Sequence, residues 1–128
     1  MIKITIPGRP VPAVRMTQRG KFVSKQAKRY LAYKDAVGMC ARAARVPMTD
    51  RPVAVEIDVY VRGQAGDWDN YAKAICDGLN GVAWEDDRQI VDGRLRRHSC
   101  ATKREERAEI IIREVKEGLP CVNAVGRR

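Results

Sequence analysis

Branched aliphatic residues at every second position between Val53 and Val61 form the pattern in this chain that most restricts its fold. Residues two apart point to the same side of an extended strand, so all of these side chains share one face. They are Val53, Val55, Ile57, Val59 and Val61. Such a strand must cover its apolar face with other parts of the chain, which predicts a layered domain that contains a β-sheet.

The same two-residue period predicts three more strands. The first covers residues 2–6, where isoleucine occupies alternate positions before a break that starts at Pro7. The other two lie in the second half of the chain, at residues 91–96 and 108–115. We expect these last two strands to be antiparallel neighbours that close the sheet.

Two helices are expected from apolar residues spaced by three and four. The first covers residues 25–46, with Ser24 as its N-cap. The second begins at residues 69–70 and ends near residue 80. Between the first strand and the first helix, residues 15–23 contain a glycine and three cationic side chains, which predicts a basic hairpin or loop.

The chain, at 128 residues, has the length of one domain with a single core. We expect a compact α/β (α+β) domain over residues 1–117, in which one mixed sheet of four or five strands packs against two helices. The expected order is strand, hairpin, helix, strand, helix, strand, strand. Residues 118–128 contain Gly, Pro and Asn without periodicity, and we expect a mobile C-terminal tail there.

The chain is strongly basic, with 25 Lys and Arg residues against 16 Asp and Glu residues and a formal net charge of +9. Its surface must attract polyanions, and nucleic acid is the first candidate partner. Charge alone does not decide this, because ribosomal and membrane-surface domains are basic as well. The chain contains no apolar run long enough to cross a membrane and no leader-like N-terminus. We therefore expect a cytoplasmic protein with reduced thiols and no membrane partner.

The spacing of cysteine and histidine does not fit a zinc site. The four cysteines lie far apart and form no CxxC pair, and His98 is the only histidine. A structural or catalytic zinc ion is therefore not expected.

An acidic cluster interrupts this basic chain where the second helix begins. Within eight residues lie Asp67, Asp69, Asn70 and Lys73. On a helix, Asp69, Lys73 and Asp77 are spaced by four and share a face away from the apolar stripe. A structural explanation is also available, because Asp69 and Asn70 can cap the helix and the spaced charges can form an exposed ladder of ion pairs. Taken locally, the cluster does not distinguish a structural role from a catalytic one.

A second acidic cluster occupies residues 85–87, and a helix and a turn can return it to the vicinity of Asp67. Converging carboxylates would repel a phosphate backbone unless a divalent cation lay between them, and hard oxygen ligands suit Mg²⁺, or Mn²⁺ in its place. The combination predicts metal-dependent phosphodiester hydrolysis. In this prediction Asp67, Asp69 and Asp87 hold the metal. Lys73 stabilises the extra negative charge of the transition state.

The two clusters occur in an order and spacing that are far more specific than a lone pair of aspartates. They read Gly66-Asp67-Trp68-Asp69-Asn70, then Lys73 and Asp77, then Trp84-Glu85-Asp86-Asp87-Arg88-Gln89-Ile90. In this they resemble the RusA-type Holliday junction resolvases, closely over residues 66–92 and loosely elsewhere.

The resemblance implies a RusA-like fold with three essential aspartates, one catalytic lysine and two supporting residues. Carried over by position, these are Asp67, Asp69, Asp87 and Lys73, supported by Asn70 and Asp86. The resemblance further implies a homodimer that cuts two strands of a four-way DNA junction symmetrically, often of phage or prophage origin. A two-fold dimer suits a two-fold substrate.

Basic side chains in two segments are candidates for DNA contact. They are Arg15, Arg19 and Lys21 in the expected hairpin, and Arg94 and Arg96 in the strand over residues 91–96. His98 shares a face with the last two, while Arg97 points to the other face. An ordinary surface loop and an exposed strand face remain alternative explanations.

Other functions fit parts of the same sequence. A nuclease for flaps, replication forks or ordinary duplex would use the same metal site on another DNA shape. In a non-catalytic DNA-binding module the acidic residues would only cap a helix, so neither Mg²⁺ nor Asp67→Asn would alter DNA affinity or integrity. A ribosome-type RNA binder would need exposed aromatic platforms, and only 5% of the residues are aromatic.

Overall fold

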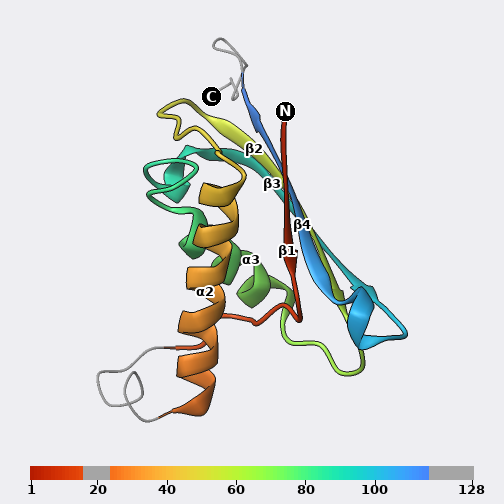
Figure 1. Cartoon of the computed structure of the whole chain (residues 1–128). Helices are drawn as coiled ribbons and strands as arrows, with labels where there is room; N and C mark the ends of the chain where they lie inside the picture. The colour runs from red at the N-terminus through yellow and green to blue at the C-terminus, as the bar shows by residue number, and fades with distance from the viewer. Residues whose placement is uncertain (16–23, 116–128) are drawn as a thin grey trace, which may run out of the picture.

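Both α-helices lie on one side of the sheet in the part of the chain that the computed structural model describes, residues 1–15 and 24–115, and no α-helix of this part covers the other side (Figure 1). The strands are β1 (Ile2–Pro7), β2 (Val53–Val61), β3 (Ile90–Ser99) and β4 (Arg107–Glu114). The helices are α2 (Lys25–Ala43) and α3 (Trp68–Leu79), with short 3₁₀ turns at η1 (Asp87–Gln89) and η2 (Lys103–Glu105). The predicted fold class is confirmed: a single α+β domain with two helices and a mixed four-stranded sheet.

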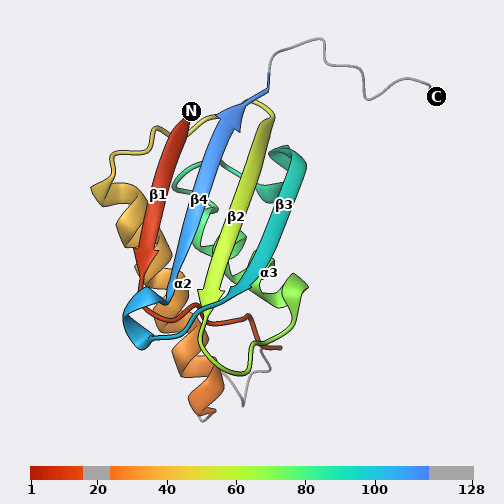
Figure 2. The same cartoon turned by 90° about the vertical axis from the view of Figure 1, so that its right-hand side faces the viewer.

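The strand order in the sheet is β1-β4-β2-β3. β4 lies between β1 and β2 and is antiparallel to both, whereas β3 pairs with β2 in parallel. The prediction that the last two strands are antiparallel neighbours is therefore wrong. An alternating pattern identifies a strand but does not specify its partner, and the segment that joins β3 to β4 crosses the end of β2 (Figure 2).

The parallel pair of β2 and β3 requires a crossover connection, and α3 provides it. A tight turn cannot join parallel strands, so the chain leaves the end of β2, forms α3 on one face of the sheet and returns to the start of β3. One acidic cluster lies at the start of α3 and the other precedes β3. Both clusters are therefore built within a single βαβ unit.

The core lies between the sheet and the two helices. The five aliphatic side chains of the alternation in β2 are each 3% exposed or less, so this predicted strand and its buried side are confirmed. Tyr30, Tyr33 and Val37 of α2 belong to the same core, as do Ile75 and Leu79 of α3. Burial of this continuous apolar surface is the main stabilising contribution to the fold.

Glycines allow α2 and α3 to approach each other closely. A Cβ atom at Gly78 would lie 2.8 Å from both the carbonyl oxygen of Lys34 and the Cβ atom of Val37. A Cβ atom at Gly38 would lie 3.2 Å from the carbonyl oxygen of Gly78. The first distance is shorter than any normal contact, so the helices can be this close only because residue 78 has no side chain.

The observed helix ends differ slightly from the predicted ones. α2 has the expected N-cap, Ser24, whose side-chain oxygen accepts a hydrogen bond from the backbone N–H of Ala27 at 3.2 Å, but it ends at Ala43 instead of residue 46. The left-handed backbone of Arg45 (φ 58°) is incompatible with a longer helix. Residues 16–23 of the predicted hairpin and the predicted tail lie outside the described residues. Neither α2 nor α3 combines the length and the apolar character that a membrane span needs.

Candidate active site

α3 begins at the first acidic cluster, with Asp67 in the N-cap position. The backbone of Asp67 is extended there (φ −70°, ψ 140°), but its carboxylate makes no capping hydrogen bond. Asp69 lies exposed in the first turn, and the carbonyl oxygen of Asn70 accepts a hydrogen bond from the backbone N–H of Ala13 at 2.9 Å. Neither Asp69 nor Asn70 is the N-cap, so capping does not explain this cluster.

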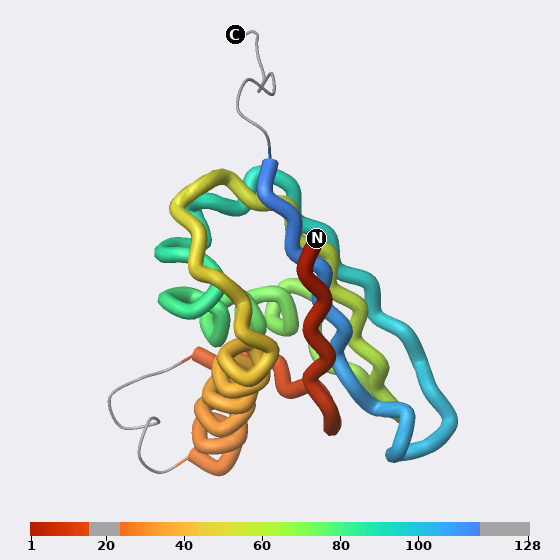
Figure 3. The backbone as a smooth tube through the Cα atoms, turned by 45° about the horizontal axis from the view of Figure 1, so that its top comes forward, coloured from red at the N-terminus to blue at the C-terminus, as the bar shows by residue number. Residues whose placement is uncertain are grey.

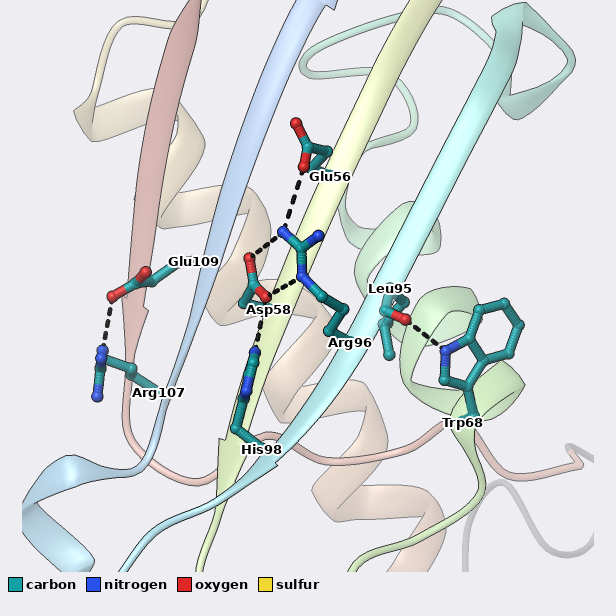
Figure 4. A network of polar contacts seen from close by, with 8 residues as sticks. All are labelled: Glu56, Asp58, Trp68, Leu95, Arg96, His98, Arg107 and Glu109. Carbon is teal, nitrogen blue, oxygen red and sulfur yellow. Dashed lines mark hydrogen bonds and ion pairs between the residues drawn. The ribbon is translucent and has the colours of Figure 1, made fainter.

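Hydrogen bonds hold the segment on both sides of the N-cap aspartate. The backbone N–H of Gly66 donates to the hydroxyl of Tyr71 at 2.8 Å. The carbonyl oxygen of Gly66 accepts from the guanidinium group of Arg97 at 2.5 Å. On the other side, the indole N–H of Trp68 donates to the carbonyl oxygen of Leu95 on β3 at 2.5 Å (Figure 4). The start of α3 is therefore fixed against the edge strand of the sheet.

The second acidic cluster leads into the 3₁₀ turn η1. The carboxylate of Asp86 accepts a hydrogen bond at 2.9 Å from the backbone N–H two residues later and so caps this turn. The side-chain oxygen of Gln89 accepts hydrogen bonds from the backbone N–H groups of Glu85 and Asp86, at 2.8 and 3.0 Å. Its amide group donates to the carbonyl oxygens of Thr49 and Arg51, both at 2.9 Å. Gln89 thus ties the acidic loop to the segment before β2. The backbones of these two segments lie side by side in Figure 3.

The carboxyl group of Asp87 lies within the electrostatic reach of α3. A side-chain hydrogen bond with Asp86 raises the pKa of Asp87, as do burial and the negative charges of Asp86 and Asp77, while the charge of Lys73 lowers it. The pKa of Asp86 is lowered, first by its hydrogen bond with the backbone of Arg88. The two adjacent carboxyl groups are therefore unequal, and ionisation of Asp87 is opposed by its surroundings.

The structure brings together some of the predicted site residues. Asp87 comes near Lys73 and Asp77, while Asp67 and Asp69 lie at the start of α3. Over residues 1–15 and 24–115, no three His, Cys, Asp or Glu side chains are grouped closely enough to hold a metal ion. The chemistry of the donors does fit Mg²⁺, because they are carboxylates and because a divalent cation would relieve the repulsion at Asp87. That three aspartates share one metal ion stays a prediction.

The predicted DNA-contact residues lie in different environments. Arg15 is exposed. It lies two residues after Ala13, whose backbone N–H is hydrogen-bonded to the first turn of α3. Arg94 is exposed on β3. Arg19 and Lys21 lie outside the described residues.

Arg96 lies on the side of the sheet that α2 and α3 leave uncovered, and carboxylates balance its charge there (Figure 4). Its Nε atom is 2.8 Å from Oδ1 of Asp58, and another guanidinium nitrogen is 3.2 Å from Oε1 of Glu56. Nε2 of His98 is 2.7 Å from the same oxygen of Asp58. A role of Arg96 in DNA contact stays a prediction. Arg97, on the helix side of β3, is the arginine that reaches the loop before α3.

Comparison with known proteins identifies the family. The chain is similar to a protein from Bacillus subtilis (strain 168) named Uncharacterized protein YqaN. The two are 29% identical over an alignment of 141 residues, gaps included, which covers 89% of this chain and 96% of that protein. The family model described as Endodeoxyribonuclease RusA matches residues 7–113, a span that contains both helices and both acidic clusters. The chain belongs to the RusA endodeoxyribonuclease family, the family that its two acidic motifs resemble.

Proposed function

We propose that this protein is a Mg²⁺-dependent endonuclease that resolves Holliday junctions by paired, symmetric cuts in two strands. Membership of the RusA family supports branched DNA as the substrate. The observation that carries the proposal is the outer face of α3. There Lys73 lies among carboxylates that do not cap the helix. The chain as a whole has a net charge of +9, so this local accumulation of carboxylates contrasts with the rest of the sequence.

In this proposal Asp67, Asp69 and Asp87 hold the metal ion. When bound, Mg²⁺ or Mn²⁺ would supply Lewis-acid chemistry: it would lower the pKa of a water nucleophile, and it would neutralise charge on the phosphate. Asp86 supports Asp87 by capping η1, and Asn70 supports the aspartates of α3 through its backbone hydrogen bond to the N-terminal segment. Both supporting residues act by fixing where the ligands lie.

Lys73 stabilises the charge that develops during cleavage. Its side chain is 63% exposed, so its ammonium group can reach a phosphate at the surface. Negative charge grows on the phosphoryl oxygens as the attacking oxygen bonds to phosphorus, and a positioned ammonium group lowers the energy of that state. Removal of Lys73 should therefore reduce kcat more than it weakens DNA binding.

DNA binding is proposed to depend on the basic surface and on a second copy of the chain. The net charge of +9 draws the polyanion to the protein. Arg15 and Arg94 are exposed candidates for phosphate contact, and Arg19 and Lys21 are further candidates. Arg96 is a weaker candidate, because Asp58 and Glu56 balance its charge. A homodimer would present two active sites related by a two-fold axis, which suits two symmetric cuts in a four-way junction.

The test is a cleavage assay with a labelled four-way junction and a matched linear duplex, each with Mg²⁺ or with EDTA. We expect paired symmetric nicks in the junction alone, only with Mg²⁺. Asp69→Asn should abolish cleavage and keep or tighten junction binding, because the loss of a carboxylate lessens repulsion of phosphate. Asp50→Asn, an equal charge change at an exposed site outside both clusters, is the control.

The other outcomes would each favour a different function. Loss of binding together with cleavage in Asp69→Asn would assign that residue a structural role. Preferential cutting of flaps or forks would favour a nuclease for other branched DNA. Intact DNA under all conditions, with binding independent of Mg²⁺, would leave the non-catalytic DNA-binding module.

A further inference from the structure

We propose that Tyr30 and Asp77 are positioning residues for Lys73. In this arrangement Tyr30, on α2, holds the carboxylate of Asp77, and Asp77 in turn holds the ammonium group of Lys73 on the outer face of α3. The inference rests on the proposed function, because it takes Lys73 as the group that acts on the phosphate. Asp77 belongs to the acidic motif of the sequence, but the motif does not indicate that a residue of α2 contacts Asp77.

Three side chains from two helices form a short chain of polar contacts. The hydroxyl of Tyr30 donates a hydrogen bond to Oδ2 of Asp77 at 2.6 Å. The Nζ atom of Lys73 lies 3.8 Å from the same oxygen. Lys73 and Asp77 are four residues apart on α3, a spacing that places their side chains next to each other. The carboxylate of Asp77 thus connects a core residue to an exposed lysine.

Exposure increases along this chain of contacts. Tyr30 is 4% exposed, and the side chains of Asp77 and Lys73 are 23% and 63% exposed. Burial raises the pKa of Tyr30, and the hydrogen bond and charge of Asp77 raise it further, so the hydroxyl keeps its proton and acts as a donor. A donor fixed in the core restrains the carboxylate, and the freedom that remains lies mainly in Lys73.

Helix stability alone does not account for this pair. An acidic residue four positions before a lysine stabilises a helix more than the reverse order, and α3 has the reverse order. Exposed ion pairs of this kind generally contribute little to stability. The hydrogen bond from Tyr30 adds a restraint that an ordinary surface pair lacks, which favours a positioning role.

The close approach of the two helices makes the contact with Tyr30 possible. Gly78, which follows Asp77 directly, is the residue whose missing side chain lets α3 lie against Lys34 and Val37 of α2. Tyr30 lies one turn before Lys34 on the same helix. The glycine contact and the hydrogen bond therefore belong to one helix–helix interface.

The kinetic test measures single-turnover cleavage of a four-way junction by the full-length protein. We expect Asp77→Asn to lower the maximal rate by about 10- to 100-fold with little change in junction affinity, because misplacement of a catalytic group by a small distance costs this much. Tyr30→Phe should cause a smaller loss of the same kind. Tyr33→Phe is the matched control: it is another core tyrosine of α2, and its hydroxyl has no hydrogen-bond partner among the described residues. Its rate should equal that of the wild type.

A double-mutant cycle separates positioning from general damage. In a Lys73→Met background, Asp77→Asn and Tyr30→Phe should have almost no further effect on the rate, because the residue that they position is gone. Equal losses in both backgrounds would overturn the inference.

An NMR measurement tests the same contacts without any cleavage. The ¹H–¹⁵N signal of the Lys73 ammonium group should move in Asp77→Asn and in Tyr30→Phe, and stay in place in Tyr33→Phe. An unmoved signal in the first two variants would overturn the inference even in an active enzyme. Moved signals in a protein that cuts no DNA would support the contacts and refute the proposed function instead.

Discussion

Two charged surfaces of this protein differ in how their charges are balanced. On the uncovered side of the sheet, Asp58 pairs with both Arg96 and His98, and Nε of Arg107 lies 2.7 Å from Oε2 of Glu109 (Figure 4). On the outer face of α3 and the adjacent acidic loop, carboxylates accumulate around a single lysine of that helix face. The charges named on the first surface are paired with one another, whereas on the second the carboxylates outnumber the cations, Lys73 and Arg88.

The pKa values of one carboxyl group from each surface express this difference. The pKa of Asp58 is lowered, first by its hydrogen bond with Arg96, so the fold favours its charged form. The pKa of Asp87 is raised, first by its hydrogen bond with Asp86, so the fold disfavours its charged form. Carboxyl groups with strongly perturbed pKa values cluster at binding and catalytic sites.

The largest expected difference between the two surfaces is in cleavage. Asp87→Asn should lower the rate of junction cleavage by at least about 1000-fold, because it removes a proposed metal ligand. Asp58→Asn, the same change on the sheet surface, should alter the rate by less than about threefold. Both rates would be measured under single-turnover conditions with saturating Mg²⁺. Comparable losses in the two variants would remove the functional distinction between the surfaces.

The second prediction concerns the helix packing on which the α3 surface depends. Gly78→Ala should lower the free energy of unfolding by up to about 2 kcal/mol, because overpacking costs about 1–3 kcal/mol and the better helix propensity of alanine offsets about 1 kcal/mol. Gly38→Ala, whose Cβ atom would have more room, should be close to neutral. Urea denaturation measures both values. An equal loss in the two variants would show that the contact at Gly78 is not the tighter one.

The third prediction is that the two aspartates affect stability with opposite signs. Because the pKa of Asp58 is lowered on folding, its ionisation stabilises the fold at pH 7, and this contribution is lost as the pH falls through the lowered pKa. Asp58→Asn should therefore destabilise by about 1 kcal/mol at pH 7 and by less in acid.

Asp87→Asn should do the reverse. Because the pKa of Asp87 is raised on folding, its ionisation opposes folding at pH 7, and this penalty is absent below the ordinary aspartate pKa. The variant should be slightly more stable than the wild type at pH 7, and the gain should disappear in acid. Thermal unfolding across pH measures both variants, and a loss of stability at pH 7 in Asp87→Asn would contradict the assigned repulsion.

The smallest expected effect distinguishes the arginines. Arg15→Ala should reduce the slope of log K against log salt for junction binding by about 1, because one phosphate contact is lost. Arg96→Ala should change the slope much less, because Asp58 and Glu56 already balance its charge. If Arg96→Ala also reduced this slope by about 1, Arg96 would be a DNA-contact residue, as predicted from its position on the strand.

Sequence patterns predicted the elements of this fold better than their arrangement. β2 could be predicted because one-sided burial imposes a two-residue period, and Ser24 because a side-chain cap is a local interaction. The position of β4 between β1 and β2 could not, because pairing depends on connections across the whole sheet.

The same limit applies to the candidate site. Its aspartates and lysine are visible as motifs, but the contacts that hold them come from residues with other apparent roles. Tyr30 contributes to the apolar stripe of α2, and only the packing of two helices brings its hydroxyl to Asp77. Arg97 follows the ordinary alternation of β3, and only the path of the loop brings Gly66 to it.

The strand order also bears on how the growing chain folds during synthesis. β1 leaves the ribosome first, yet its neighbour in the described sheet, β4, leaves it last. β2, α3 and β3 follow one another, so the unit that contains the acidic clusters can assemble while β1 still has open edges. Until β4 arrives, the edges of β1 and β2 that it later covers are available for pairing with other nascent chains. A chain that stops before Arg107 would therefore retain its motifs and be prone to aggregation.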